Sequence, residues 1–158
     1  DVMRAIFETN NLGLASTFHP FIAPMRQRRR GTLVGIASVA GIRGLPGHAA
    51  YTASKAGVIN TCESLRIELR AQGIKVVTIA PGYIDTPMTQ GNPFTMPFLL
   101  SAEGFAERAF KAIEAGVSYR VIPWQMGVLA KLLRLLPNAV LDRLLAGRGR
   151  KPRATPSS

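Results

Sequence analysis

Two short apolar runs that flank a long stretch of helical periodicity place the strongest constraint on the fold. Residues 32–38 and 74–80 are rich in β-branched and other apolar side chains, which is typical of strands buried on both faces of a sheet. Residues 49–71, between them, have the pattern of a helix, and Gly73 follows as a C-terminal glycine. A strand, a helix and a strand in this order predict parallel pairing and a doubly wound α/β sheet.

Helices and a third strand are predicted on either side of this unit. The chain begins inside the periodicity of a helix over residues 1–30, with no initiator methionine or capping residue before it, so we expect a truncated sequence. Ser101 is placed to start a helix that runs to about residue 116, with Glu103 in its first turn. A short strand over residues 119–123 would complete this half of the sheet.

Three polar residues around the central helix predict a proton-transfer site. Tyr51 and Lys55 are four residues apart, and Ser38 lies thirteen residues before Tyr51. A spacing of four places two side chains on one helix face, so the ammonium can lie beside the phenol. A nearby positive charge favours the phenolate, which lets a tyrosine exchange a proton near neutral pH. With the Ser38 hydroxyl holding a carbonyl oxygen against the phenol, these are the parts of a carbonyl/alcohol redox site.

The same residues resemble the catalytic set of the short-chain dehydrogenase/reductases. Residues 10–13, Asn-Asn-Leu-Gly, resemble the Asn-x-x-Gly motif of that family. Residues 81–86, Pro-Gly-Tyr-Ile-Asp-Thr, resemble its Pro-Gly-x-x-x-Thr segment. The motifs occur in the family's order and cover about residues 1–123. The resemblance implies an oxidoreductase that uses NAD or NADP to transfer hydride to or from a small carbonyl or alcohol substrate.

The resemblance also implies a role for each site residue. Tyr51 would exchange the proton, Ser38 would steady the substrate oxygen, and Lys55 would also reach the nicotinamide ribose. Asn10 would shape its helix and hold a water that relays protons to the lysine, although a mid-helix asparagine can also be merely tolerated. Thr86 and the backbone near Ile84 would hold the nicotinamide amide, unless Thr86 is a plain cap or turn residue. The cofactor-binding set implied in this way is Tyr51, Lys55, Pro81, Gly82, Ile84 and Thr86.

The sequence lacks the glycine-rich turn with which the family receives the cofactor pyrophosphate. Gly41, Gly44 and Gly47 follow a predicted strand, but they lack the G-x-G-x-x-G spacing and fit a flexible substrate-side loop better. We therefore expect residues 1–123 to be the C-terminal part of a Rossmann-type domain whose cofactor half is missing. This piece alone is expected to be inactive.

Other candidate chemistry in the sequence is weak. His19 and His48 have no partners at metal-ligand spacing, so no metal is expected. The single cysteine, Cys62, is in helical step with Val58 and is predicted to be a small buried side chain. Residues 87–100 mix methionine and phenylalanine with proline, which is typical either of a lid over a hydrophobic substrate or of packing onto the core.

Residues 124–158 are predicted to form an amphipathic, basic helical tail. From Val128 onward there are seven basic residues and one acidic residue, which gives +6 of the chain's net charge of +11. Pro137 is expected to break or kink the helix. A stripe of apolar residues beside a basic run is typical of a weak, peripheral membrane contact or of packing on a neighbouring subunit. The stripe consists of Leu129, Leu132, Leu133, Leu136, Val140, Leu141, Leu144 and Leu145.

The positive charge also raises the question of nucleic-acid binding. The basic run over residues 26–30 is typical of a helix C-terminus, where cations oppose the macrodipole, and contact with nucleic acid or a cofactor phosphate is the weaker alternative. With no recognised nucleic-acid motif, no nucleic-acid partner is expected. We expect a cytoplasmic homo-oligomer, peripheral to a membrane if the tail binds one. A non-catalytic binding or scaffold module of the same fold is the alternative.

Overall fold

The structure is a computed structural model that describes residues 1–87, 89–90, 92 and 95–146. Its centre is a parallel sheet of three strands in the order β1-β2-β5. The strands are β1 (Gly31–Ile36), β2 (Ile74–Pro81) and β5 (Tyr119–Ile122). In the register, Gly31 is opposite Ile74 and Thr78 is opposite Tyr119. The predicted parallel arrangement of the α/β sheet is confirmed.

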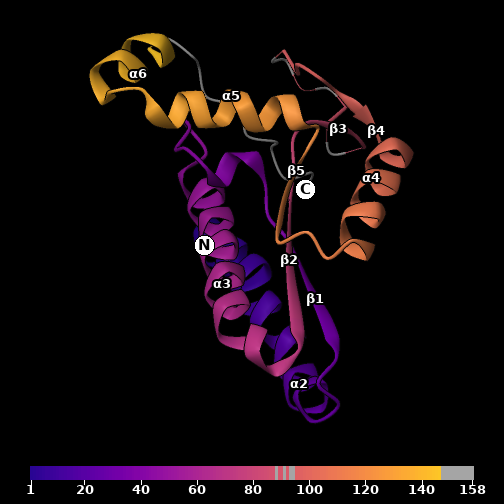
Figure 1. Cartoon of the computed structure of the whole chain (residues 1–158). Coiled ribbons are helices and arrows are strands. Elements are labelled where there is room, and N and C mark those ends of the chain that lie inside the picture. Colours follow the sequence, from indigo (N-terminus) through magenta and orange to yellow (C-terminus); the bar gives the residue numbers. More distant parts are fainter. Residues whose placement is uncertain (88, 91, 93–94, 147–158) are drawn as a thin grey trace.

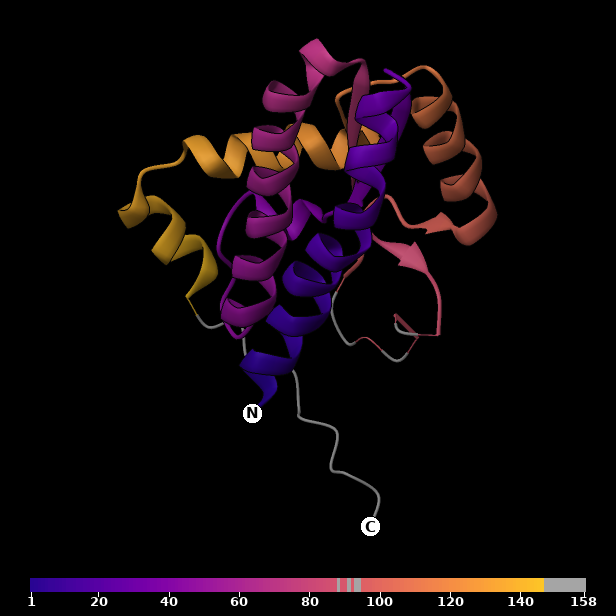
Figure 2. The same ribbon diagram turned by 90° about the horizontal axis from the view of Figure 1, so that it is seen from below.

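Helices cover both faces of this sheet (Figure 1). One face carries the N-terminal helices and α3 (Ala49–Leu69), and α4 (Ala102–Glu114) packs on the opposite face. The view from below places the N-terminal helices alongside α3 (Figure 2). A smaller parallel pair, β3 (Ile84–Asp85) and β4 (Leu100–Ser101), lies between β2 and α4 in the sequence.

The sequence predicted one regular helix over residues 1–30, but the N-terminal helix is interrupted. It consists of α1 (Val2–Phe7), a π-helical turn η1 (Glu8–Leu12) and α2 (Gly13–Gln27). A π turn inserts an extra residue into the helical repeat and is frequent at functional sites. Asn10 lies in this turn. After α2, Arg29 approaches Gly73, whose φ of 76° suits glycine and where an added Cβ would lie 2.1 Å from the Arg29 carbonyl oxygen.

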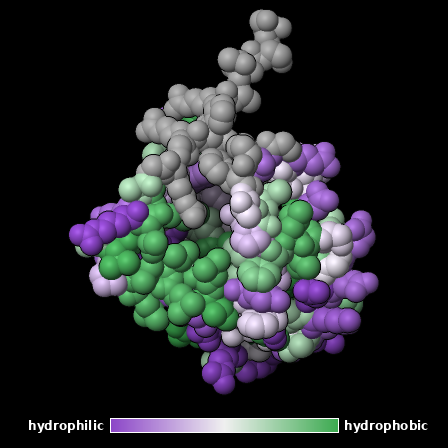
Figure 3. All heavy atoms as spheres, turned by 90° about the horizontal axis from the view of Figure 1, so that it is seen from above, coloured by the Kyte–Doolittle hydropathy of each residue, from purple (hydrophilic) through white to green (hydrophobic). Residues whose placement is uncertain are grey.

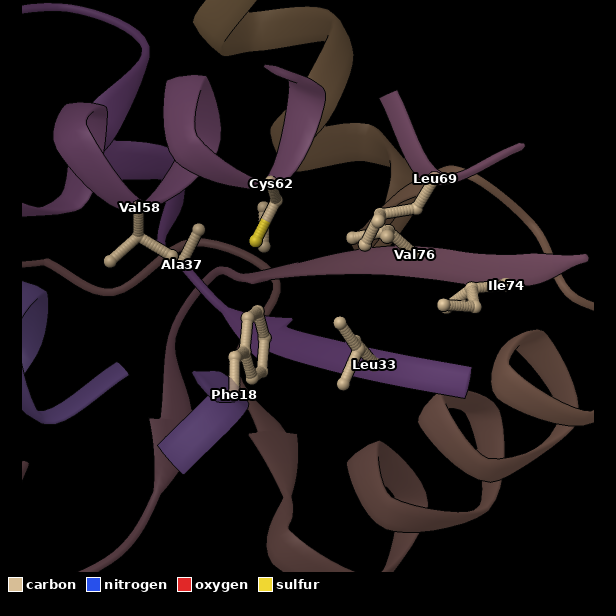
Figure 4. Close-up of a cluster of buried hydrophobic side chains, with 9 residues drawn as sticks. Phe18, Leu33, Ala37, Val58, Cys62, Leu69, Ile74 and Val76 are labelled. Carbon is tan, nitrogen blue, oxygen red and sulfur yellow. The ribbon is translucent and has the colours of Figure 1, made fainter. Parts of the chain in front are cut away.

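The alternation of side chains along β2 divides the core into two clusters. Ile74, Val76 and Ala80 join the cluster beneath α2 and α3, whereas Val77 and Ile79 join the cluster beneath α4. Figure 4 shows the first cluster, in which Cys62 of α3 points toward the sheet. Cys62 has no exposed surface, so its predicted burial is confirmed. Burial also raises the pKa of its thiol, and a hydrogen bond with Thr78 opposes that change.

Two helices follow the last strand. α5 (Trp124–Leu135) and α6 (Asn138–Leu145) are separated at Pro137, which confirms the predicted break. α5 lies across the carboxyl ends of β2 and β5 (Figure 1). Within the described ranges, no helix is both long and apolar enough to cross a membrane.

Some predictions fall partly or wholly outside the described residues. Within the predicted lid, residues 88, 91, 93 and 94 lie outside them, and of the rest Phe98 and Leu99 are exposed. Residues 147–158, which hold the last basic residues of the tail, also lie outside them.

Candidate active site

Tyr51 and Lys55 share one face at the start of α3. Tyr51 lies in the first turn of the helix, which begins at Ala49, and Lys55 follows one turn later. The Lys55 Nζ atom lies 5.9 Å from the centroid of the Tyr51 ring. The same atom donates a 3.0 Å hydrogen bond to the carbonyl oxygen of Ile36, the last residue of β1. The ammonium therefore links the phenol-bearing helix to the carboxyl end of β1.

The environment of Lys55 differs from that of a surface lysine. Its side chain is half-buried between α3 and the end of β1. This burial lowers the pKa of the Lys55 ammonium from its ordinary value of 10.5, because desolvation disfavours the charged form. Loss of a proton from Lys55 is thus easier than in water, which suits a group that takes part in proton exchange.

Ser38 occupies a defined position directly after β1. It is buried and forms the N-cap of the short 3₁₀ turn η2 (Val39–Gly41). Its Oγ atom accepts a 3.1 Å hydrogen bond from the backbone N–H of Ala40. Because that contact uses the oxygen as an acceptor, the Ser38 O–H can still donate to another oxygen.

A close backbone approach fixes this turn against α3. A Cβ added at Gly41 would lie 2.7 Å from the backbone carbonyl carbon of Lys55 and 2.9 Å from the nitrogen of Ala56. Only glycine fits such a gap without a shift of the backbone. Gly41 therefore holds the segment after Ser38 directly against the turn of α3 that contains Lys55.

The structure connects Asn10 to the same helix through a residue that the sequence reasoning missed. The Asn10 Nδ2 atom donates a 2.9 Å hydrogen bond to the hydroxyl of Ser54, which in turn donates a 2.8 Å bond to the Tyr51 carbonyl oxygen. Ser54 has no exposed surface. Its spacing of four from Val58, and of eight from Cys62, was the available signal of burial.

Asn11 strengthens this contact from the same π turn. Its Nδ2 atom donates a 3.1 Å hydrogen bond to the backbone oxygen of Ser54. It also lies against Gly57, where an added Cβ would come within 2.5 Å of that nitrogen. Both asparagines of the motif over residues 10–13 thus bind the turn of α3 that lies between Tyr51 and Lys55.

The predicted cofactor segment follows β2 at the same edge of the sheet. Pro81 is the last residue of β2, and the N–H of Gly82 donates a 2.8 Å hydrogen bond to the Ile122 oxygen. Ile84 begins β3, and Thr86 is half-buried just after it. The carboxyl ends of parallel strands are where ligands bind in open α/β sheets.

Thr89 orders this segment, and the sequence reasoning did not identify it. Its Oγ1 atom accepts a 2.9 Å hydrogen bond from the Thr86 N–H and lies 2.7 Å from the Ile84 oxygen. The turn thereby gains a fixed shape that sets the direction of the Thr86 side chain. No local sequence pattern marks such a contact, because threonine is common in turns of many kinds.

The donors and acceptors along this edge suit a nicotinamide nucleoside. An ammonium from Lys55 and a hydroxyl from Thr86 are groups that bind ribose hydroxyls and a carboxamide, respectively. Over residues 1–87, 89–90, 92 and 95–146, no group of three or more His, Cys, Asp or Glu side chains is placed to hold a metal ion.

Comparison with known proteins identifies the family of this chain. The sequence model of the family described as short chain dehydrogenase matches residues 1–95. This chain belongs to the short-chain dehydrogenase family. An uncharacterized oxidoreductase from Myxococcus xanthus is 42% identical to it over 140 residues, which cover 89% of this chain and 55% of the relative. A 3-oxoacyl-[acyl-carrier-protein] reductase from Chlamydia muridarum is 40% identical over 87 residues, covering 55% of this chain and 35% of the relative.

A solved structure of a family member has the same fold. It is a short chain dehydrogenase from Burkholderia cenocepacia in complex with NADP, with a TM-score of 0.78 and 25% identity. The match covers 91% of this chain and 59% of that one. The chain spans about half the length of these curated relatives, and its fold is that of a Rossmann-type member of the family.

Proposed function

We propose that the full-length protein is an NAD(P)-dependent oxidoreductase that transfers hydride between a nicotinamide cofactor and a carbonyl or alcohol substrate. The observation that carries the proposal is the meeting of Tyr51, Lys55 and the end of β1, with Lys55 Nζ 5.9 Å from the phenol ring and 3.0 Å from the Ile36 oxygen. Membership of an oxidoreductase family supports it. A scaffold module of the same fold would not require this arrangement.

The residues of this chain account for the proton and the oxygen of the reaction. In reduction, the Tyr51 O–H gives its proton to the carbonyl oxygen as that oxygen gains charge. The Ser38 O–H donates a hydrogen bond to the same oxygen and fixes its position. The Lys55 ammonium stabilises the phenolate left on Tyr51. Asn10 acts through Ser54 to hold the turn of α3 that carries Tyr51 and Lys55.

The cofactor would be held by groups at the carboxyl edge of the sheet. When bound, NAD(P)H supplies the hydride, which the protein itself cannot supply. Lys55 would hold the ribose next to the nicotinamide, and Pro81 and Gly82 would form the floor beside it. The backbone at Ile84 and the hydroxyl of Thr86 would hold the carboxamide.

We propose an apolar substrate for this site. Phe98 and Leu99 are exposed, by 51% and 43%, although they belong to a segment that leads from the cofactor-side turn into α4. Exposed apolar side chains beside a polar reaction site favour a substrate with an apolar body and one reactive oxygen. The exposure of Phe98 and Leu99 favours the lid interpretation of their segment over simple core packing.

We also propose that the full-length protein is a homo-oligomer. The N-terminal helices and α3 lie side by side and expose large apolar side chains, among them Val2, Met3, Leu12, Phe21 and Ile67. Helical faces of this kind are typical of subunit contacts. We take residues 1–123 as one part of the Rossmann-type domain, and residues 124–158 as a tail.

The reaction is tested with the full-length protein and the variant Ser38→Ala. Oxidation of NADPH or NADH, followed by absorbance with an apolar ketone or aldehyde, should occur with the wild type. Ser38→Ala should lower kcat by about 100-fold, because it removes a hydrogen bond that is strongest in the transition state. Ser64→Ala, at an exposed serine of α3, is the matched control. Equal kcat for Ser38→Ala and wild type would contradict the role given to Ser38.

A further inference from the structure

The outer side of α5 has a stripe of exposed apolar residues that no described part of the chain covers. Its members follow one another at spacings of four, four and three, which places them on one helix face. The exposed fractions are 66% for Trp124, 48% for Val128, 57% for Leu132 and 79% for Leu135. On α6, Val140 and Leu144 are also exposed. The view from above shows a broad apolar area on the side of the molecule that carries these helices (Figure 3).

The stripe is held rigidly by the opposite face of α5. Met126, Gly127 and Ala130 are buried there. A Cβ added at Gly82 would lie 2.8 Å from the Met126 side chain, so the helix packs tightly on the segment that follows β2. This is a packed helix with two apolar faces, of which only one is used within the described structure.

A second tie joins the turn between α5 and α6 to the loop that follows Ser38. The Arg43 Nη2 atom donates a 2.9 Å hydrogen bond to Asn138 Oδ1 and a 3.4 Å bond to the Leu136 oxygen. The two helices therefore keep a fixed orientation relative to the proposed active site. Their exposed faces form one surface on that side of the molecule.

Basic residues border this apolar surface. Lys131 and Arg134 on α5 and Arg143 on α6 are exposed, against one exposed acidic residue, Asp142. The sequence continues with four more basic residues and no acidic ones. An apolar stripe with a tryptophan and a basic border matches the interface of a bilayer with anionic head groups.

We infer that the outer face of α5 and α6 docks onto an anionic membrane surface, an interaction beyond the proposed reaction. The charge of the border favours an anionic membrane over a second copy of the chain as the partner of this face. A two-fold contact would place each basic border against its own copy, so that like charges would meet. An anionic bilayer instead offers opposite charge to the border and an apolar interior to the stripe.

Flotation of the full-length protein with vesicles tests the inference. The vesicles contain phosphatidylcholine with phosphatidylglycerol, or phosphatidylcholine alone. We expect flotation with the anionic vesicles, and a loss of binding when salt is raised about tenfold from low ionic strength, because screening weakens the basic contacts. The double variant Leu132→Gln/Leu135→Gln and the triple variant Lys131→Gln/Arg134→Gln/Arg143→Gln should each bind at least about tenfold less.

The control is Phe110→Gln, which removes one exposed apolar side chain from α4 and should bind like the wild type. Thermal unfolding of every variant checks that each is folded. Absence of flotation for the wild type, or wild-type binding by either test variant, would overturn the inference. So would loss of an oligomer, rather than of lipid binding, in the leucine double variant. NADPH oxidation measured without vesicles is independent of these outcomes and reports on the reaction alone.

Discussion

The side-chain amide of Asn10 donates a 2.9 Å hydrogen bond to the fully buried hydroxyl of Ser54, 44 residues later in the chain. Ser54 passes the contact on to the Tyr51 carbonyl oxygen, one turn back in α3. The π turn of the N-terminal helix is thereby joined to the turn that contains the proposed proton-transfer residues. Asn10 and Ser54 form a mechanical link between two segments that the sequence does not place together.

Removal of the Asn10–Ser54 hydrogen bond should lower the free energy of unfolding. Ser54→Ala leaves the half-buried Asn10 amide without this acceptor, which costs about 1–3 kcal/mol in the free energy of unfolding. Urea denaturation of the full-length protein and its Ser54→Ala variant measures this difference in the free energy of unfolding. The control, Ser64→Ala, removes an exposed hydroxyl from the same helix and should change the free energy of unfolding by less than about 0.5 kcal/mol. Similar values for the two variants would contradict the link.

The contact of Gly41 with α3 gives a second prediction. Gly41→Ala forces the turn after Ser38 away from the Lys55 backbone, which should cost about 1–3 kcal/mol of stability and lower kcat. Gly44→Ala is the matched control, because a Cβ at Gly44 meets nothing within 4 Å. Denaturation and steady-state kinetics of both variants check the prediction. If Gly44→Ala lost as much activity as Gly41→Ala, the close approach would not be the cause.

Because of Lys55, the free energy of unfolding should depend on pH in the alkaline range. Its folded pKa is lowered by burial, so between that pKa and the unfolded value of 10.5 the unfolded chain binds more protons than the folded one. The free energy of unfolding therefore increases with pH between these two pKa values. Below the folded pKa, Lys55 is charged in both states, and the destabilisation caused by burying its charge is fully present.

Lys55→Met lacks this contribution. The stability of the wild type relative to Lys55→Met should rise as the pH is raised toward 10.5, the ordinary pKa of a lysine. Lys111→Met, at an exposed lysine of α4, is the reference variant measured in parallel. Urea denaturation across this pH range gives the comparison. A difference between wild type and Lys55→Met that falls with pH would have the wrong sign.

The chain of 158 residues alone should show no measurable turnover, although Ser38, Tyr51 and Lys55 are all present. Proton-transfer groups act on a substrate only when it is positioned against the nicotinamide ring, and such positioning supplies several kcal/mol of the barrier. Adding the part of the longer relatives that this chain does not cover should restore NAD(P)H-dependent reduction. Turnover by the 158-residue chain at the rate of the longer protein would contradict this prediction.

Local patterns predicted most of the fold. The β-branched run at residues 74–80 gave the central strand, since side chains buried on both faces of a parallel strand leave little room for polar residues. Pro137 marked the end of α5 because it cannot continue a helix. The spacing of four between Tyr51 and Lys55 placed both on one face of α3, as the 5.9 Å contact bears out.

Contacts between distant segments were beyond the reach of these patterns. Periodicity gave one helix over residues 1–30, because a π turn changes the hydrogen-bond pattern without changing the composition. Ser54 was read only as part of a helix, since its partner Asn10 lies far away in sequence. The bond from Arg43 to Asn138 joins a loop to a helix turn 95 residues later and has no signature in either segment.

The most direct test is the steady-state kinetics of Tyr51→Phe in the full-length protein, with NADPH or NADH binding measured alongside. The variant removes only the phenolic proton, so kcat should fall by about 100-fold or more while cofactor affinity stays nearly unchanged. Tyr119→Phe, at a half-buried tyrosine of β5, is the matched control and should keep wild-type turnover. Wild-type turnover by Tyr51→Phe would show that Tyr51 is not the acid or base of the reaction.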